Sequence, residues 1–151
     1  LFTQKQIPKI MINSKNGNLN LNGFELLPFS KFELIDHFQE VNIQEIRDLN
    51  NGWKWLDIIN LKVDNRYFDF SLGYYENRLN LILLTFKESP SFDKSTWKDW
   101  SDEKELNNEK EFENWLINEL GEVRNFNWGN VYSVYDSKSG FSSIKIDYKK
   151  N

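Results

Sequence analysis

The last third of the chain, residues 97–148, reads WKDWSDEKELNNEKEFENWLINELGEVRNFNWGNVYSVYDSKSGFSSIKIDY and contains its clearest secondary-structure signals. Ser101 and the acidic residues after it predict the start of a helix, because they complement the free amide groups at a helix N-terminus. Gly121 predicts the end of this helix, since glycine readily adopts the left-handed conformation of a C-cap. Two strands are expected next, at about 128–135 and 141–148, joined by a hairpin turn over 136–140.

The predicted helix over 101–120 carries its apolar residues unevenly. Leu106 is the one large apolar residue of its first half, whereas the second half has an apolar face of four residues: Phe112, Trp115, Leu116 and Leu120. We therefore expect the second half to pack on the body of the protein and the first half to project into solvent.

The middle of the chain has the pattern of β-strands. Residues 68–74 alternate large apolar with small or polar side chains, and a turn near Glu76 leads into a strand over 79–86 that is apolar on both faces. Such a strand is expected to be central and to have a helix on at least one of its faces.

Shorter signals complete the prediction. Asn16-Gly17 predicts a hairpin within 7–24, and Asn51-Gly52 predicts a hairpin that joins 43–49 to 53–59, with a second helix from about Asn42 as the alternative. After Pro28, the capping-box pattern Ser30-Lys31-Phe32-Glu33 predicts a short helix to about Phe38. The expected fold class is α+β, a single domain over 1–151 with one antiparallel sheet of about six or seven strands and two helices packed on it.

Composition excludes several classes of protein. The chain of 151 residues has no cysteine, which rules out disulfides, thiolate catalysis and cysteine-based zinc sites. Its formal net charge of −4 gives no overall basic character, so direct nucleic-acid binding is not expected. Neither a membrane-spanning run nor a signal segment is visible, and we expect a cytoplasmic protein. The glycines are scattered and form no phosphate-binding loop, so no cofactor is predicted.

Catalytic chemistry has weak support. His37 is the one histidine and is interpreted as a solvent-facing or half-packed side chain. Carboxylates gather in two places and could serve a carboxylate-only hydrolase or hold a cation, but no calcium-loop pattern is present. We interpret them as a solvated acidic surface and predict neither a metal site nor an enzyme, with the hydrolase as an alternative. The two groups are Asp64 with Asp69, and Asp99 with Asp102 and Glu103.

The tryptophans offer another alternative. Trp97 and Trp100 fall in a polar stretch, where exposed rings could stack on a sugar. A carbohydrate- or peptide-binding module is therefore the second interpretation of the chain.

The acidic helix gives the stronger signal. Residues 102–113 contain six acids against two lysines. Glu109 forms like-charge i,i+4 pairs with Glu105 and Glu113, each costing a few tenths of a kcal/mol in an isolated helix. A cationic partner would turn this repulsion into attraction. The predicted partner-binding residues are Asp102, Glu103, Glu105 and Glu109.

A pattern of residues over about 97–148 carries a resemblance to a family. It consists of Trp97-x-x-Trp100-Ser101-x-Glu103-Lys104-Glu105-Leu106, Trp115-Leu116, Leu120-Gly121, Trp128-Gly129, Ser133-x-Tyr135-Asp136-x-Lys138-Ser139-Gly140 and Ser142-Ser143-Ile144. This pattern is similar to that of small bacterial immunity proteins carried beside polymorphic or contact-dependent growth-inhibition toxins. The resemblance implies a protein that binds its cognate toxin domain, often a nuclease with a basic cleft, and blocks it in the cytoplasm; it assigns no individual contact residue.

Overall fold

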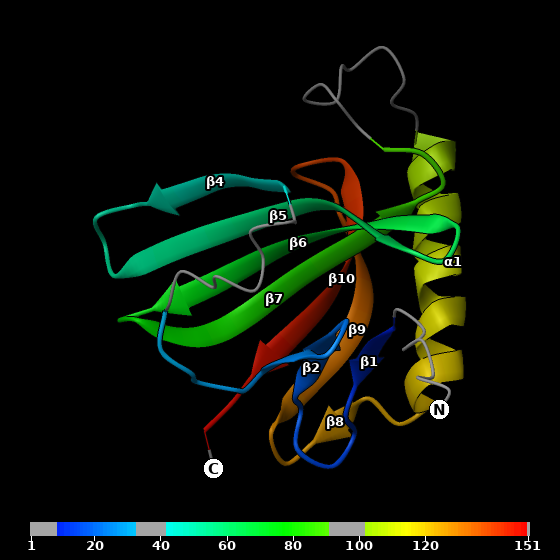
Figure 1. Ribbon diagram of the computed structural model, residues 1–151. Coiled ribbons are helices and arrows are strands. Elements are labelled where there is room, and N and C mark those ends of the chain that lie inside the picture. Colours follow the sequence, from blue (N-terminus) through cyan, green and yellow to red (C-terminus); the bar gives the residue numbers. More distant parts are fainter. Residues whose placement is uncertain (1–8, 33–41, 91–101, 151) are drawn as a thin grey trace, which may run out of the picture.

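Two β-sheets and one long helix make up the part of the protein that the computed structural model describes, residues 9–32, 42–90 and 102–150 (Figure 1). The elements in chain order are β1 (Ile10–Ile12), β2 (Leu19–Leu21), β3 (Phe24–Leu26), β4 (Asn42–Asp48), β5 (Trp53–Val63), β6 (Arg66–Tyr75), β7 (Arg78–Lys87), α1 (Asp102–Leu120), β8 (Asn125–Phe126), β9 (Gly129–Asp136) and β10 (Phe141–Tyr148).

The large sheet has seven antiparallel strands in the order β4-β5-β6-β7-β10-β9-β8. The expected alternation of buried and more exposed side chains along the strands is confirmed. One face of the sheet carries nearly all the buried side chains, and no fully buried side chain lies on the other face. We call these the core face and the open face. The core face is formed by Leu56, Ile58, Phe68, Phe70, Leu72, Tyr74, Ile82, Leu84, Val131, Ile144 and Ile146.

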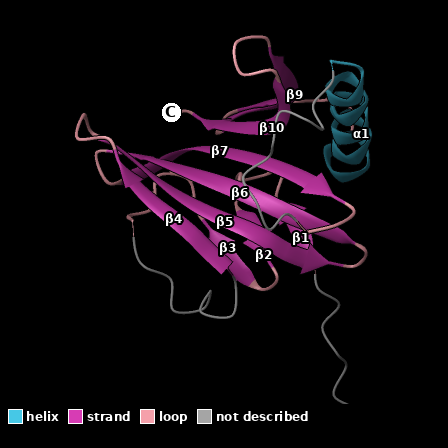
Figure 2. Ribbon diagram, turned by 90° about the horizontal axis from the view of Figure 1, so that it is seen from above, coloured by secondary structure: helices cyan, strands magenta, loops and turns pink. Residues whose placement is uncertain are grey.

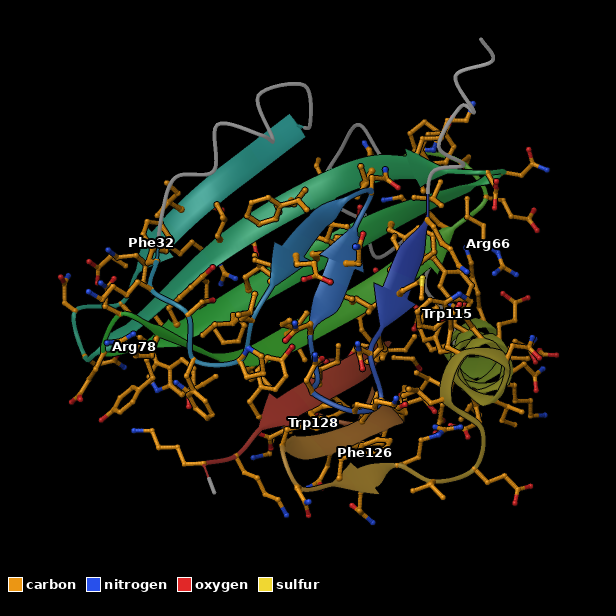
Figure 3. The ribbon with its side chains drawn as sticks, turned by 60° about the horizontal axis from the view of Figure 1, so that its bottom comes forward. Phe32, Arg66, Arg78, Trp115, Phe126 and Trp128 are labelled. Atoms are coloured by element: carbon orange, nitrogen blue, oxygen red, sulfur yellow. The ribbon has the colours of Figure 1, made fainter. Side chains whose placement is uncertain are left out.

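The strands β1, β2 and β3 form a second sheet, so the prediction of a single sheet was wrong. Each of these strands has only three residues, and most of their apolar side chains are almost completely buried. The small sheet therefore lies against the core face of the large sheet, as Figure 3 shows, and closes the core. Its buried residues are Ile10, Ile12, Leu19, Leu21 and Leu26.

Helix α1 stands beside the small sheet on the same side of the large sheet (Figures 1 and 2). Phe112 and Leu116 are buried against the sheet, and the ring of Trp115 packs near those of Phe68 and Phe86. Gly121 ends the helix as predicted, with φ +79° and an N–H that donates to the carbonyl of Ile117 at 2.8 Å. The expected packing of the second half is thus confirmed.

The second predicted helix does not begin at Ser30. Lys31 instead forms a β-bridge with Arg78, and the carbonyl of Ser30 accepts from the N–H of Leu79 at 2.9 Å. The ring of Phe32 meets that of Tyr74 edge-on at 5.1 Å. Sheet hydrogen bonds and this ring contact outweigh a cap of about 1 kcal/mol. The rest of that prediction, over 33–38, lies outside the described residues, in which α1 is the one helix.

The predicted hairpins at the two asparagine–glycine pairs are confirmed by the pairings of β1 with β2 and of β4 with β5. The alternative helix from Asn42 is therefore excluded. At the far end of the core, the indole N–H of Trp128 donates to the carbonyl of Ser14 at 2.9 Å, and the hydroxyl of Tyr148 donates to that of Gly17 at 2.6 Å. These bonds attach the first hairpin to the C-terminal strands.

Candidate partner interface

Glu105, one of the four predicted partner-binding residues, is not on the surface. Its side chain is only 8% exposed, and its Oε2 atom accepts from the backbone N–H of Ser142 on β10 at 2.9 Å. The hydroxyl of Ser142 donates in return to the carbonyl of Glu105 at 2.7 Å. The first half of α1 is therefore attached to the sheet, contrary to the expectation that it projects freely. We remove Glu105 from the proposed contact residues.

Glu113 has a structural partner as well. It makes a bidentate pair with Arg124 at 2.7 and 3.2 Å and accepts from the hydroxyl of Ser133 at 3.0 Å. Arg124 also donates to the carbonyl of Gly121, at the C-terminal end of α1. In the series Glu105, Glu109 and Glu113, the first and the last residue are therefore hydrogen-bonded to strands of the sheet.

The acids of the first three turns of α1 that are not bonded to the sheet include Glu103 and Glu111, which are exposed, and Glu109, which is half-buried. We call these three side chains the acidic ridge. Asp102 is the first residue of α1, and its side chain is outside the described part of the structure. Leu106 and Ile117 are apolar residues of the same helix and are 48% and 44% exposed. A helix surface that combines acids with exposed apolar side chains can contact a protein both electrostatically and by burial.

A groove runs beside the ridge, between α1 and the β5–β6 hairpin. It contains two adjoining cavities of about 360 and 620 Å³ that share Arg66 and Trp115 in their walls. The guanidinium of Arg66 lies over the ring of Phe86 at 4.5 Å, and no carboxylate of the described residues forms an ion pair with it. Glu111 of the ridge lines the larger cavity.

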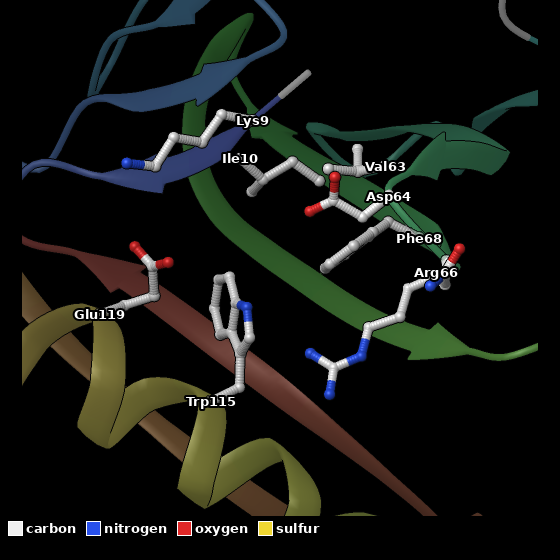
Figure 4. A pocket seen from close by; sticks show the side chains of 9 residues that line it. Lys9, Ile10, Val63, Asp64, Arg66, Phe68, Trp115 and Glu119 are labelled. Atoms are coloured by element: carbon white, nitrogen blue, oxygen red, sulfur yellow. The ribbon is translucent and has the colours of Figure 1, made fainter. Parts of the chain in front are cut away.

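Figure 4 shows the smaller cavity, with the Trp115 ring between Glu119 and Arg66. Burial raises the pKa of Glu119, and the nearby charge of Lys9 lowers it by a smaller amount. Tryptophan and arginine are the residues most enriched at the energetic centres of protein interfaces. Sequence reasoning assigned Trp115 to packing alone, because only the structure brings Arg66 to it.

The open face of the large sheet carries a second group of aromatic residues. Trp53 and Trp55 stack on each other at 5.8 Å, and Tyr75 lies 5.2 Å from Trp53. Trp55 can lie flat on β6 because Gly73 stands opposite it: a Cβ atom there would approach the ring to 2.8 Å. Arg47 lies over the same ring at 5.8 Å.

The charges on this face are largely paired. Asp57 accepts from Arg47 at 3.0 and 3.2 Å and from the hydroxyl of Ser71 at 2.7 Å. Asp69 pairs with Lys87 at 2.6 Å and accepts from the N–H of Asn60. Asp64, which lies near Asp69 in sequence, lines the smaller cavity instead.

Within the described ranges, no group of three His, Asp or Glu side chains is placed to hold a metal ion. Likewise, no helix there has the length and apolar character needed to cross a membrane. Further residues considered in the sequence lie outside the described ranges, and the interpretations based on them stay predictions: His37, Trp97, Asp99, Trp100 and the predicted helix cap Ser101.

Comparisons with known proteins inform the fold alone. No family model matches the chain, and no curated protein matches its sequence. A solved structure described as "Rhs1-CT in complex with cognate immunity protein RhsI1" contains a similar chain, with a TM-score of 0.55 and 14% sequence identity. The likeness covers 93% of this chain and 88% of that chain. The similarity therefore extends over nearly the whole fold of this chain.

Proposed function

We propose that this chain is an immunity protein, which binds a cognate bacterial toxin domain in the cytoplasm and neutralises it by covering its active site. The observation that carries the proposal is the likeness, over 93% of the chain, to a chain of a complex that contains an immunity protein. The sequence pattern over 97–148 supports it independently. In this proposal the chain acts by binding alone, without catalysis, metal or cofactor.

The acidic ridge and the neighbouring groove are the proposed contact surface. Residues 102–120 carry seven acids and two lysines, so α1 contributes more negative charge than the whole chain has net. Glu105 and Glu113 are engaged with the sheet, but Glu103, Glu109 and Glu111 face outward or sideways. Asp102 is retained as a proposed contact because it extends the same helix.

The matching partner is a toxin domain with a basic cleft, and a nuclease fits this description best. A nuclease must attract a phosphate backbone, so its active site carries positive charge. An acidic helix laid across such a cleft would replace the phosphates. Trp115 and Arg66 would then anchor the edge of the toxin in the groove, where an aromatic ring and a planar cation give large contact area.

The first experiment tests the function without assuming a surface. The C-terminal domain of a large protein encoded beside this chain is expressed in bacteria with and without it. We expect growth arrest from the domain alone, rescue by co-expression, and a 1:1 complex of the purified pair. A toxic neighbour that this chain neither binds nor silences would overturn the proposal.

The second experiment tests the surface. The double variant Glu103→Lys/Glu109→Lys is compared with Glu25→Lys/Glu76→Lys, which changes the net charge equally at exposed positions on β3 and the β6–β7 turn. We expect the first to bind the toxin about tenfold more weakly or worse, about 1.4 kcal/mol, and the control to bind normally. Wild-type affinity should also fall with added salt. If both double variants bound the toxin with equal affinity, the proposed function would stand, but the acidic ridge would be excluded as the contact surface.

A further inference from the structure

Strand β4 forms one edge of the large sheet, as Figures 1 and 2 show. Six of its seven residues pair with β5 on one side, and no described strand pairs with the other side. The opposite edge of the sheet, β8, has only two residues. An exposed edge strand of this length offers a row of backbone donors and acceptors to another strand.

The backbone groups that face outward can be identified from the turn. The N–H of Leu49 donates to the carbonyl of Trp53 at 3.0 Å, so Leu49 directs its hydrogen-bonding groups toward β5. These groups alternate along an antiparallel strand. Arg47 and Glu45 therefore also bond inward, whereas Ile46 and Asp48 direct their N–H and C=O groups to the open edge.

The charged side chains of β4 differ in whether they have an ionic partner. Glu45 stands directly opposite Asp57 in the register of β4 and β5, and like charges in this position are destabilising. Arg47 pairs with Asp57, whereas no ion pair to Glu45 exists among the described residues. Glu45 is exposed, so its carboxylate is accessible to a cation on a chain that pairs with the open edge.

We propose that a second copy of this chain supplies that cation, by pairing β4 with β4 in antiparallel fashion about a two-fold axis at Ile46. The two Ile46 residues would exchange backbone hydrogen bonds, since both bond outward. Glu45 of each copy would then stand opposite Arg47 of the other, in the pair type whose side chains are closest.

Other registers that use outward-bonding residues are unfavourable. A two-fold axis at Arg47 would place the two Arg47 side chains opposite each other, and an axis at Asp48 would do so for the two Asp48 side chains. Like charges that stand directly opposite each other are destabilising. The register about Ile46 alone pairs opposite charges twice. The irregularity between Ile43 and Glu45 confines regular pairing to the C-terminal part of β4.

Exposed apolar side chains lie along the same seam. Ile46 is 44% exposed and Leu49 is 50% exposed. Pairing about Ile46 would bring the two Ile46 side chains together beside the edge of the core face, since Ile46 stands opposite buried Leu56. The dimer is isologous, so the same strand serves both copies. The acidic ridge on α1 is at the other end of the sheet and stays free (Figure 1).

Sedimentation equilibrium on the full chain tests the proposal, because one copy has a mass of 18.1 kDa. We expect a dimer that dissociates on dilution and with added salt. Ile46→Lys should abolish it, whereas Met11→Lys, at a residue of 43% exposure on β1, should leave it intact. A wild-type monomer at every concentration, or a dimer that survives Ile46→Lys, would overturn the proposal.

Charge exchange tests the register. Glu45→Arg and Arg47→Glu should each be monomeric, and an equimolar mixture of the two should form a heterodimer, because both cross-strand pairs are then attractive again. Failure of two folded variants to associate would overturn the register. Arg47→Glu also loses its pair with Asp57, so circular dichroism checks its fold; if it does not fold, the Ile46 and Met11 variants decide.

Discussion

Glu105 and Ser142 hold each other by two hydrogen bonds that run in opposite directions, although they are 37 residues apart in sequence. The carboxylate of Glu105 accepts from a backbone N–H, and the hydroxyl of Ser142 donates to a backbone carbonyl. Both residues are buried, with 8% and 4% exposure. The first turns of α1 are therefore fixed to β10 by a polar contact rather than by apolar packing.

Truncation of Glu105 should consequently reduce stability. Glu105→Ala leaves the N–H of Ser142 buried without an acceptor, which typically costs about 1–3 kcal/mol. Glu105→Gln keeps an acceptor oxygen and should lose less. Urea unfolding measures both, with Glu103→Ala as the control at an exposed position of the same helix, expected within about 0.5 kcal/mol of wild type. If Glu105→Ala were as stable as Glu103→Ala, the structural role assigned to this residue would be wrong.

Gly17 should tolerate alanine much less well than Gly121, although both have φ +79°. A Cβ atom at Gly17 would come within 2.5 Å of the Trp128 ring, whereas at Gly121 nothing lies within 4 Å. Gly121→Ala therefore measures backbone strain alone, about 1 kcal/mol. Gly17→Ala adds displacement of a buried ring, a further 1–3 kcal/mol or so. Thermal unfolding of both variants gives the difference, and equal losses would show that the Trp128 contact is unimportant.

Local signals predicted those parts of the fold that depend on neighbouring residues. Gly121 and the Asn51-Gly52 turn act within a few residues, and the structure confirms the helix end and the hairpin. Ser30 carries an equally local signal, but its backbone pairs with Leu79, which no capping pattern can anticipate.

The candidate site was harder to predict for the same reason. Seen in sequence, Glu105, Glu109 and Glu113 form one acidic series. In the structure the first and last have partners 37 and 20 residues away, and only the middle one belongs to the acidic ridge. The Arg66 side chain, 49 residues before Trp115, completes a groove that no spacing within the helix indicates.

Glu119 should make the stability of the protein depend on pH. Burial is the larger influence on this carboxyl and raises its pKa above the ordinary value of 4.5, while Lys9 opposes the change. The folded state therefore binds this proton more tightly than the unfolded state. The resulting stabilisation is fully present below pH 4.5 and is lost as the pH rises through the folded-state value.

Glu119→Gln removes this ionisation and should raise the melting temperature at pH 7 relative to wild type. The advantage should shrink as the pH falls through the raised folded-state pKa and should be lost below pH 4.5, where the wild-type carboxyl is also neutral. Glu122→Gln, at an exposed residue just past the helix, is the matched control for the change from carboxylate to amide. Melting curves from pH 3.5 to 7 test this, and a constant or inverted difference would contradict it.

Gly73 and Trp55 should be energetically coupled across β5 and β6. Gly73→Ala introduces a Cβ atom 2.8–2.9 Å from the far edge of the Trp55 ring, so that ring must tilt and its stacking on Trp53 is disturbed. We expect a loss of about 0.5–1.5 kcal/mol. The shorter ring in Trp55→Phe leaves room for the methyl group, so Gly73→Ala should cost less in that background.

A double-mutant cycle measures this coupling, with a change in near-ultraviolet circular dichroism as an independent sign that the Trp53–Trp55 stack is altered. A coupling energy of at least about 0.5 kcal/mol is expected for residues in contact. If the two substitutions were strictly additive and the spectrum of Gly73→Ala matched wild type, the ring of Trp55 would not rest on Gly73 in solution. The aromatic group of the open face would then have to be arranged differently from the stack described above.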